Sequence, residues 1–261
     1  MGVLDTFSLK GKIALCTGGA GLYGRQIVTA LAQSGAQTFI AARDQAKLEA
    51  VAAEERAAGN DVTALSLDLS SDESIAALHK TIIERAGRCD VLVNNAVTRS
   101  AMSGWENDLD AYDQSLRVNA SALFKITSLF GRSMAANKAG SIINIGSMMG
   151  MVGIEMGNYL GTDMQANPSP IYHYEKGGMI NFTRWAASIL GKDNVRVNCL
   201  SPGGLFSNQP APFVKNYSDR TQLGRMANAT DLMGSIVFLA SDASAYITGA
   251  NIPVDGGYTA K

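Results

Sequence analysis

Tyr172 and Lys176 are the residues whose types and spacing most clearly allow chemistry. They stand four positions apart in a segment with a helical pattern, so both side chains lie on one helix face. A free phenol has a pKa of about 10, and a neighbouring ammonium group favours its ionised form, at about 1.4 kcal/mol for each pKa unit. Tyr172 can therefore act as a general acid or base tuned by Lys176, the alternative being an ordinary pair on a solvated helix face. Neither Tyr159 nor Tyr174 has a lysine four positions later.

A glycine-rich turn early in the chain supplies the second chemical feature. It fits the pattern G-x-G-x-x-G, between an expected strand at 12–17 and a helix that ends near Gly35. Without β-carbons the backbone can approach a pyrophosphate, which then binds the free N–H groups at the helix N-terminus. The turn therefore predicts a dinucleotide site, although tight packing alone also selects glycines. The residues expected at the cofactor here are Gly18, Gly19, Gly21, Leu22 and Gly24.

The end of the second expected strand bears on the choice between NAD and NADP. A carboxylate there binds the ribose 2′-hydroxyl of NAD, whereas an arginine accommodates the 2′-phosphate of NADP. The chain has both residue types, as Arg43 and Asp44. Asp44 is also placed as an N-cap for the next helix, which would occupy its side chain. NADP is therefore slightly favoured over NAD, and both residues are predicted to lie at the cofactor.

Short apolar strands alternate with longer helical patterns along the whole chain. This alternation predicts a doubly wound, Rossmann-like α/β fold, with a seven-stranded parallel sheet and helices on both faces. No linker-like stretch divides the sequence, so residues 1–261 are expected to form a single domain. A capping box of Ser70 and Glu73 is predicted to open the third helix. The expected strands are 12–17, 37–42, 62–68, 91–94, 141–145, 195–200 and 251–254.

Composition and charge count against several classes of protein. Hydrophobic residues make up 46 % of the chain, so disorder is not expected. The net charge is −1 and no basic stripe is present, so neither a nucleic-acid partner nor a polybasic membrane anchor is expected. The widely spaced Cys16, Cys89 and Cys199 predict free buried thiols, with no disulfide and no metal site. No apolar run is long enough to cross a bilayer, so we expect a cytoplasmic protein. His79 and His173 are given no catalytic role.

The set of motifs resembles that of the short-chain dehydrogenase/reductase family. The resemblance spans nearly the whole chain, and the motifs follow one another in the family's order. Each motif is weak alone, but together they identify the family. Besides the glycine turn and the Tyr172–Lys176 pair, they are Asp68, Asn94-Asn95-Ala96, Ser147 and Pro202-Gly203, each placed after an expected strand, and Val254–Gly257 near the end.

The resemblance implies a role for each of these residues. Tyr172 would exchange the proton with the substrate, while Lys176 tunes it and holds the nicotinamide ribose. Ser147 would polarise the substrate oxygen, and Asn119 would support a water relay to the lysine. The further cofactor-binding residues that the resemblance implies are Asp68 and Leu69 at the adenine, Asn95 and Ala96 at the ribose, Pro202 and Gly203, and Leu205 and Ser207 at the carboxamide.

A glycine pair, Gly177-Gly178, follows Lys176 inside the expected helix. Two glycines there cost about 2 kcal/mol relative to alanine, and the close approach of another backbone would compensate for them. The family often packs this helix against its copy in a partner subunit. A homodimer or homotetramer is therefore expected.

The chain departs from the family pattern at three places. Leu22 and Val97 stand where the family has glycines. Ser147 and Tyr172 are 25 residues apart, which is more than the family usually has. The surplus is an insertion at 153–170, and it leaves from beside Ser147 and returns beside Tyr172. Together with the loop 203–219, it is expected to form the mouth of the substrate site.

The insertion also bears on the substrate. Its polar side chains predict a hydroxyl-rich compound such as a sugar or polyol derivative. Arg99 could meet an anionic group, or it could simply be solvated. The polar residues of the insertion are Glu155, Asn158, Tyr159, Thr162, Asp163 and Gln165.

The predicted function is an NAD(P)-dependent oxidoreductase. Hydride would pass between nicotinamide and a secondary alcohol or carbonyl, while Tyr172 transfers the proton. One alternative is a non-catalytic dinucleotide sensor, which the intact set of catalytic residues disfavours. The other is an epimerase or dehydratase on the same scaffold, which the absence of a separate substrate domain disfavours.

Overall fold

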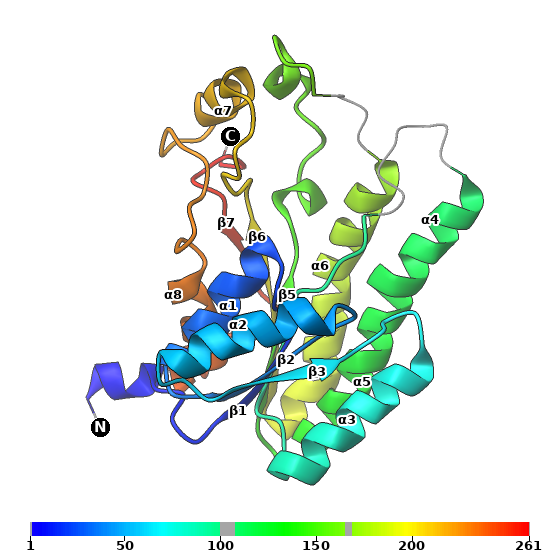
Figure 1. The fold of residues 1–261 in the computed structure, drawn as a ribbon, viewed down its shortest axis with the longest axis vertical. Helices are drawn as coiled ribbons and strands as arrows, with labels where there is room; N and C mark the ends of the chain where they lie inside the picture. The colour runs from blue at the N-terminus through cyan, green and yellow to red at the C-terminus, as the bar shows by residue number, and fades with distance from the viewer. Residues whose placement is uncertain (1, 100–107, 165–168, 261) are drawn as a thin grey trace.

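The computed structural model describes residues 2–99, 108–164 and 169–260. A parallel sheet of seven strands runs through its centre, in the order β3-β2-β1-β4-β5-β6-β7 (Figure 1). This sheet confirms the predicted doubly wound α/β fold. The strands are β1 (Ile13–Thr17), β2 (Gln37–Ala42), β3 (Val62–Ser66), β4 (Val91–Asn94), β5 (Gly140–Ile145), β6 (Val195–Pro202) and β7 (Asn251–Val254).

Helices connect the strands, as parallel pairing requires. A π-helical turn, Arg117–Ser121, joins the fourth helix to the fifth. In the described ranges no helix is both long and apolar enough to pass through a membrane. The helices are α1 (Leu22–Gln33), α2 (Gln45–Ala57), α3 (Asp72–Ala86), α4 (Leu109–Leu116), α5 (Ala122–Ala136), α6 (Pro170–Leu190), α7 (Ala211–Ser218) and α8 (Met233–Ala240).

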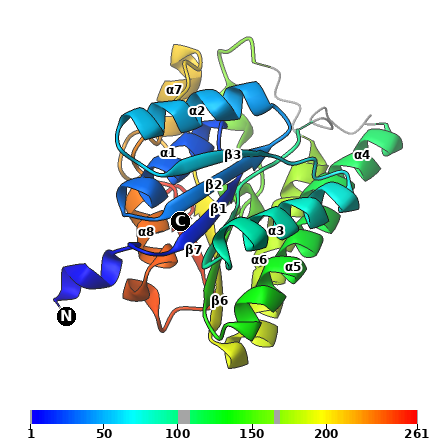
Figure 2. The ribbon, with the colours of Figure 1, turned by 60° about the horizontal axis from the view of Figure 1, so that its bottom comes forward.

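The sheet is covered on both faces because its strands are apolar on both sides. In β1, Ala14 and Cys16 pack into one apolar layer and Leu15 into the other. Helices α1, α2 and α8 cover the first face, and α3, α5 and α6 cover the second (Figure 2). All three cysteines are free and buried, as predicted, and burial raises the pKa of each thiol.

Two local predictions were wrong. The N-cap of α3 is Ser71, whose hydroxyl accepts a hydrogen bond from the Ser74 backbone N–H, and not Ser70. Ser70 instead donates its hydroxyl to the carboxylate of Asp68, at 2.7 Å. The loop 203–219 also contains α7, a helix that the sequence reading did not predict.

The topology determines where a ligand can bind. The strand order reverses between β1 and β4, which are neighbours in the sheet. From β1 the chain adds β2 and β3 on one side, and from β4 it adds β5, β6 and β7 on the other side. In open α/β sheets a crevice forms at such a point, outside the carboxyl ends of the strands. The glycine turn follows β1 and the Asn95-Ala96 segment follows β4, so both lie at this crevice.

Candidate active site

A cavity of about 820 Å³ lies at the carboxyl ends of the strands. Its walls come from the segments after β1 to β6, and from α6, α7 and the insertion 153–170. Most of the predicted site residues line it. They are Gly18, Gly21, Leu22, Gly24, Arg43, Asp68, Leu69, Asn95, Ala96, Ser147, Tyr172, Lys176, Pro202, Gly203 and Leu205.

Four predicted site residues are not part of the cavity wall. Gly19 packs toward the core, where an added β-carbon would lie 2.9 Å from Cβ of Ile40. Asp44 is the N-cap of α2, as its alternative reading predicts, and the Lys47 backbone N–H lowers the pKa of its carboxyl. Ser207 lies beyond the wall, where its backbone N–H donates to Oε1 of Gln209. Asn119 is buried behind the wall.

The glycine turn is shaped for a ligand that needs close backbone approach. An added β-carbon at Gly24 would lie 2.1 Å from the carbonyl oxygen of Gly18, so no side chain fits there. Gly18 has φ of +70°, which also favours glycine. Asn95 ties the turn to β4, because its Nδ2 donates to the carbonyls of Thr17 and Gly18, each at 3.0 Å. These features fit the pyrophosphate of a dinucleotide.

Leu22 and Val97, which replace family glycines, are accommodated without strain. Neither residue has a positive φ, and both side chains are exposed at the cavity. Leu22 is the first residue of α1, with Gly21 as its N-cap. The N–H groups of the first helical turn therefore remain available to an anion.

Tyr172 and Lys176 come to the cavity from successive turns of α6. The Lys176 side chain is 4 % exposed, and its Nζ lies 5.8 Å from the centre of the Tyr172 ring. Nζ donates to the carbonyl oxygen of Ile145 at 2.7 Å, which fixes its position at the end of β5. Burial lowers the pKa of the Lys176 ammonium, and the neighbouring Tyr172 opposes this shift.

Ser147 follows β5 and faces the same cavity. Its Oγ accepts a hydrogen bond from the Met149 backbone N–H, at 3.1 Å, as the N-cap of the short 3₁₀ helix Met148–Gly150. A hydroxyl has one hydrogen to donate in addition to its acceptor positions. Among the described residues no acceptor takes this hydrogen, so it can point toward a substrate oxygen.

Arg43 and Asp68 both line the cavity. The hydroxyl and backbone N–H of Ser70 lower the pKa of the Asp68 carboxyl, and the charge of Arg43 adds to this effect. Arg43 therefore lies close enough to Asp68 to interact with it electrostatically. Its guanidinium forms no ion pair in the described part of the chain, whereas Asp44 pairs with Lys47.

Part of the cavity wall comes from the insertion 153–170 and from the segment 203–219. Of the six polar residues predicted in the insertion, Asn158 and Tyr159 line the cavity. Glu155 instead accepts from the backbone of Gly157, and Gln165 lies outside the described residues. The remaining two, Thr162 and Asp163, are not part of the wall.

Sequence reasoning missed several lining residues. Phe213 and Tyr217 enter the wall from α7, which sits over the insertion. Burial raises the pKa of Tyr217 to about 12, so its hydroxyl stays protonated. The helical spacing of Phe213 and Tyr217 is the signal that could have found them, but the helix is short and contains a proline at 212.

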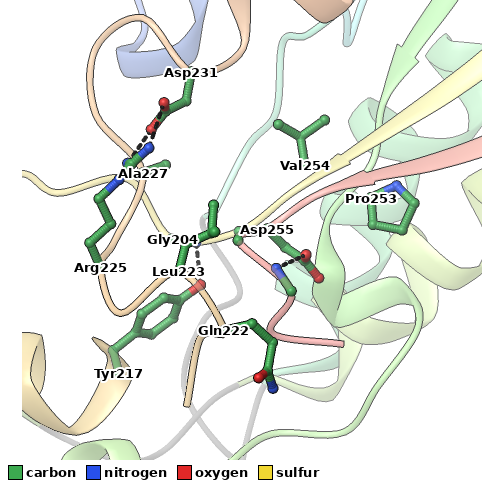
Figure 3. A pocket seen from close by; sticks show the side chains of 13 residues that line it. Gly204, Tyr217, Gln222, Leu223, Arg225, Ala227, Asp231, Pro253, Val254 and Asp255 are labelled. Carbon is green, nitrogen blue, oxygen red and sulfur yellow. Dashed lines mark hydrogen bonds and ion pairs between the residues drawn. The ribbon is translucent and has the colours of Figure 1, made fainter. Parts of the chain in front are cut away.

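A smaller cavity of about 460 Å³ lies behind the Gly203-Gly204 segment (Figure 3). Tyr217 Oη accepts from the Gly204 N–H between the two cavities, since both residues line each of them. Arg225 is neutralised there by an ion pair with Asp231, and Asp255 accepts from the Gly257 N–H. The groups that could hold a charged ligand are therefore already paired, and the large cavity is the candidate site.

The close approach of another backbone that the glycine pair predicts is present at Gly177. The backbone that approaches it belongs to Gly150 of the same chain, where an added β-carbon would lie 2.6 Å from the Lys176 carbonyl oxygen. This contact packs the Met148–Gly150 turn onto α6, and so places Ser147 beside Lys176. A β-carbon at Gly178 would have no neighbour within 4 Å.

Known proteins share both the sequence pattern and the fold. A family model described as enoyl-(acyl carrier protein) reductase matches residues 21–259. The chain belongs to the short-chain dehydrogenase/reductase family. It is 33 % identical over 255 residues to a 3-oxoacyl-[acyl-carrier-protein] reductase of Pseudomonas aeruginosa, covering 96 % of this chain and 98 % of that protein.

Two further members of the short-chain dehydrogenase/reductase family have polyhydroxylated compounds in their names. A galactitol 2-dehydrogenase (L-tagatose-forming) of Cereibacter sphaeroides is 31 % identical over 259 residues, covering 97 % of each chain. The crystal structure of a gluconate 5-dehydrogenase from Burkholderia cenocepacia, in complex with NADP and tartrate, superposes with a TM-score of 0.88 and 27 % identity over all of both chains. The protein is therefore an NAD(P)-dependent oxidoreductase of alcohols or carbonyls, as predicted.

Proposed function

We propose that this enzyme interconverts an alcohol and a carbonyl on a polyhydroxylated substrate, with Ser147, Tyr172 and Lys176 as its catalytic residues. The observation that carries this proposal is that all three line one cavity with the glycine turn. A dinucleotide seated on the turn and extended along that cavity would reach the three side chains. Asn119, which is behind the wall, supports them indirectly.

The chemistry follows from what each side chain can do. Bound NAD(P) supplies or accepts the hydride. Ser147 donates its free hydroxyl hydrogen to the substrate oxygen and stabilises the charge that develops there. Tyr172 gives that oxygen a proton in reduction and takes it back in oxidation. Lys176, held by the Ile145 carbonyl, places a positive charge beside the Tyr172 ring, with Nζ 5.8 Å from the ring centre.

The preference for NADP is part of the proposal. Arg43 lines the cavity at the end of β2 without an ion pair in the described ranges, so it can meet a 2′-phosphate. Asp44 is held at the α2 N-terminus by Lys47 and is less available to a ribose hydroxyl.

The substrate class rests on the insertion 153–170 and the segment 203–219, which we propose form the mouth of the site. Asn158 and Tyr159 offer polar atoms there, and Arg99 offers a positive charge over the Tyr172 ring, 5.8 Å from its centre. Arg99 forms no ion pair with a described carboxylate. A sugar acid would use both kinds of group, and the names of the galactitol and gluconate relatives favour hydroxyl-rich compounds.

The test is a fluorescence titration with NADPH and NADH, followed by turnover on a panel of sugars, polyols, sugar acids and keto acids. We expect the wild type to bind NADPH more tightly than NADH. The Arg43→Ala variant should bind NADPH about tenfold more weakly than the wild type, with little change in its affinity for NADH. Turnover is expected to be highest for hydroxyl-rich compounds. Equal affinity of the wild type for both cofactors would contradict the proposed preference for NADP. Activity confined to simple aliphatic ketones would contradict the proposed substrate class.

We also propose a homodimer or homotetramer in the cytoplasm, built around an exposed aromatic face of α5 and α6. Phe124 and Trp185 are 52 % and 51 % exposed, and both contact the ring of Phe182. Such rings are enriched at interfaces. Light scattering is expected to give a multiple of the chain mass for the wild type and a smaller assembly for Trp185→Glu. The control Leu4→Glu, at an exposed N-terminal position, should leave the mass unchanged, and a monomeric wild type would refute the idea.

A further inference from the structure

Glu175 is a buried carboxyl group inside the catalytic helix that the proposed mechanism does not use. It lies between Tyr172 and Lys176 in α6, and it is 6 % exposed. Its Oε1 accepts a hydrogen bond from the Ser115 hydroxyl, and its Oε2 accepts one from Nδ2 of Asn119, both at 2.8 Å. A carboxyl group at this depth normally has a specific partner, and here both oxygens have one.

Asn119 connects this carboxyl group to the cofactor cavity. Its Oδ1 accepts from the Thr98 backbone N–H at 2.9 Å, and its Nδ2 donates to the Thr98 carbonyl oxygen at 3.0 Å. The side chain of Asn119 therefore pairs with the backbone of Thr98 as a neighbouring strand would. Thr98 belongs to the segment Asn95–Arg99, which lines the cavity and carries Arg99 to the Tyr172 ring.

The Glu175 carboxylate and the Thr98 backbone favour the same orientation of the Asn119 amide. In the observed orientation, Nδ2 faces the acceptor Glu175 and Oδ1 faces the donor Thr98 N–H. If the amide were turned over, its oxygen would face the carboxylate and its N–H₂ group would face another N–H. Both contacts would be repulsive. A residue without an acceptor at position 175 would leave the Asn119 amide held by the Thr98 backbone and the Ser115 hydroxyl, without its contact to α6.

Asn119 also sits in the π-helical turn Arg117–Ser121, in which the backbone N–H of Ala122 bonds to the Arg117 carbonyl oxygen. Such turns carry less regular hydrogen bonding than an α-helix and often occur at functional positions. The side chains of Ser115 and Glu175 therefore fix this turn from two helices, α4 and α6. The charge of Lys176 acts on the Glu175 carboxyl group, while its hydrogen-bond partners from α4 and the π turn, Ser115 and Asn119, are neutral.

We propose that Glu175 is a positioning residue, whose carboxylate fixes the Asn119 amide and through it the Asn95–Arg99 segment against the bound cofactor. The proposal rests on the cofactor part of the proposed function and is independent of the substrate. Its effect is therefore measured first as cofactor affinity, without turnover.

The experiment compares NADPH dissociation constants of Glu175→Ala and Glu175→Gln by fluorescence titration. Alanine removes the acceptor, so we expect the dissociation constant to rise about tenfold. Glutamine keeps one oxygen for Asn119 and can donate to Ser115, so we expect it to restore affinity to within about threefold. Ser115→Ala removes the other donor to the carboxyl group and also an acceptor of Asn119 Nδ2, at 3.2 Å, so we expect a smaller loss of affinity than for Glu175→Ala. The control is Tyr174→Phe, at an exposed position of the same helix, whose affinity should match the wild type.

A double-mutant cycle separates positioning from a general loss of stability. If Glu175 acts through Asn119, the double variant Glu175→Ala, Asn119→Ala should bind NADPH no more weakly than the weaker single variant. Independent effects that multiply would overturn the proposal, as would a Glu175→Gln variant as weak as Glu175→Ala. Should alanine at 175 prevent folding, Glu175→Met fills the space without an acceptor and takes its place in the cycle. If the wild type bound neither NADPH nor NADH, the proposed function itself would be refuted.

Discussion

Tyr172→Phe is expected to reduce kcat about 1,000-fold while the affinity for NADPH changes less than about threefold. The substitution removes one oxygen atom, which is the group that exchanges a proton with the substrate, and general acid–base catalysis is typically worth 10²–10⁴ in rate. The ring itself remains, and with it the packing beside Lys176 and Arg99. Steady-state kinetics and a fluorescence titration measure the two effects separately.

The control for this variant is Tyr174→Phe. Tyr174 lies on the same helix, but its side chain is exposed and it does not line the cavity. It should keep wild-type kinetics. If Tyr172→Phe retained more than about a tenth of the wild-type kcat, the phenol would not be the proton-transfer group.

Lys176→Met is expected to reduce kcat by about 1,000-fold and also to change how stability depends on pH. Burial lowers the pKa of this lysine in the folded protein below its value of about 10.4 in the unfolded chain. Between the two pKa values the unfolded chain binds more protons, so the free energy of unfolding of the wild type rises with pH. Methionine has no proton to lose and lacks this contribution.

The measurement is urea unfolding of both proteins at intervals from neutral pH to about pH 10. The wild type should gain stability relative to Lys176→Met as the pH rises through this window. Lys192→Met, at an exposed position after α6, is the control and should follow the wild type. A difference in stability that stays constant with pH would show that the Lys176 ammonium is not desolvated as the structure indicates.

The fold could be predicted from the sequence because local signals and topology agree. The glycine turn after the first strand and the alternation of strands and helices leave few arrangements other than a doubly wound sheet. The family resemblance assigned Asn95, Ser147 and the Gly203 segment to one site, and the fold brings them together because the carboxyl ends of parallel strands lie at one edge of the sheet. The cavity contains all three.

The details that failed depend on contacts that sequence spacing does not encode. Ser70 and Ser71 are equally good caps by type, and the choice follows from Asp68, which binds the hydroxyl of Ser70. Glu175 was overlooked because its partners, Ser115 and Asn119, come from other elements, and a charged residue beside Lys176 reads as part of a solvated face.

The most direct test of the account is the fate of deuterium carried at both hydrogen positions of C4 of NADPH. With the wild type and the best carbonyl substrate from the panel, mass spectrometry should find deuterium on the carbinol carbon of the product. Tyr172→Phe should transfer it about 1,000-fold more slowly while still binding the labelled cofactor. A product formed at the wild-type rate without deuterium on that carbon would contradict hydride transfer in this cavity.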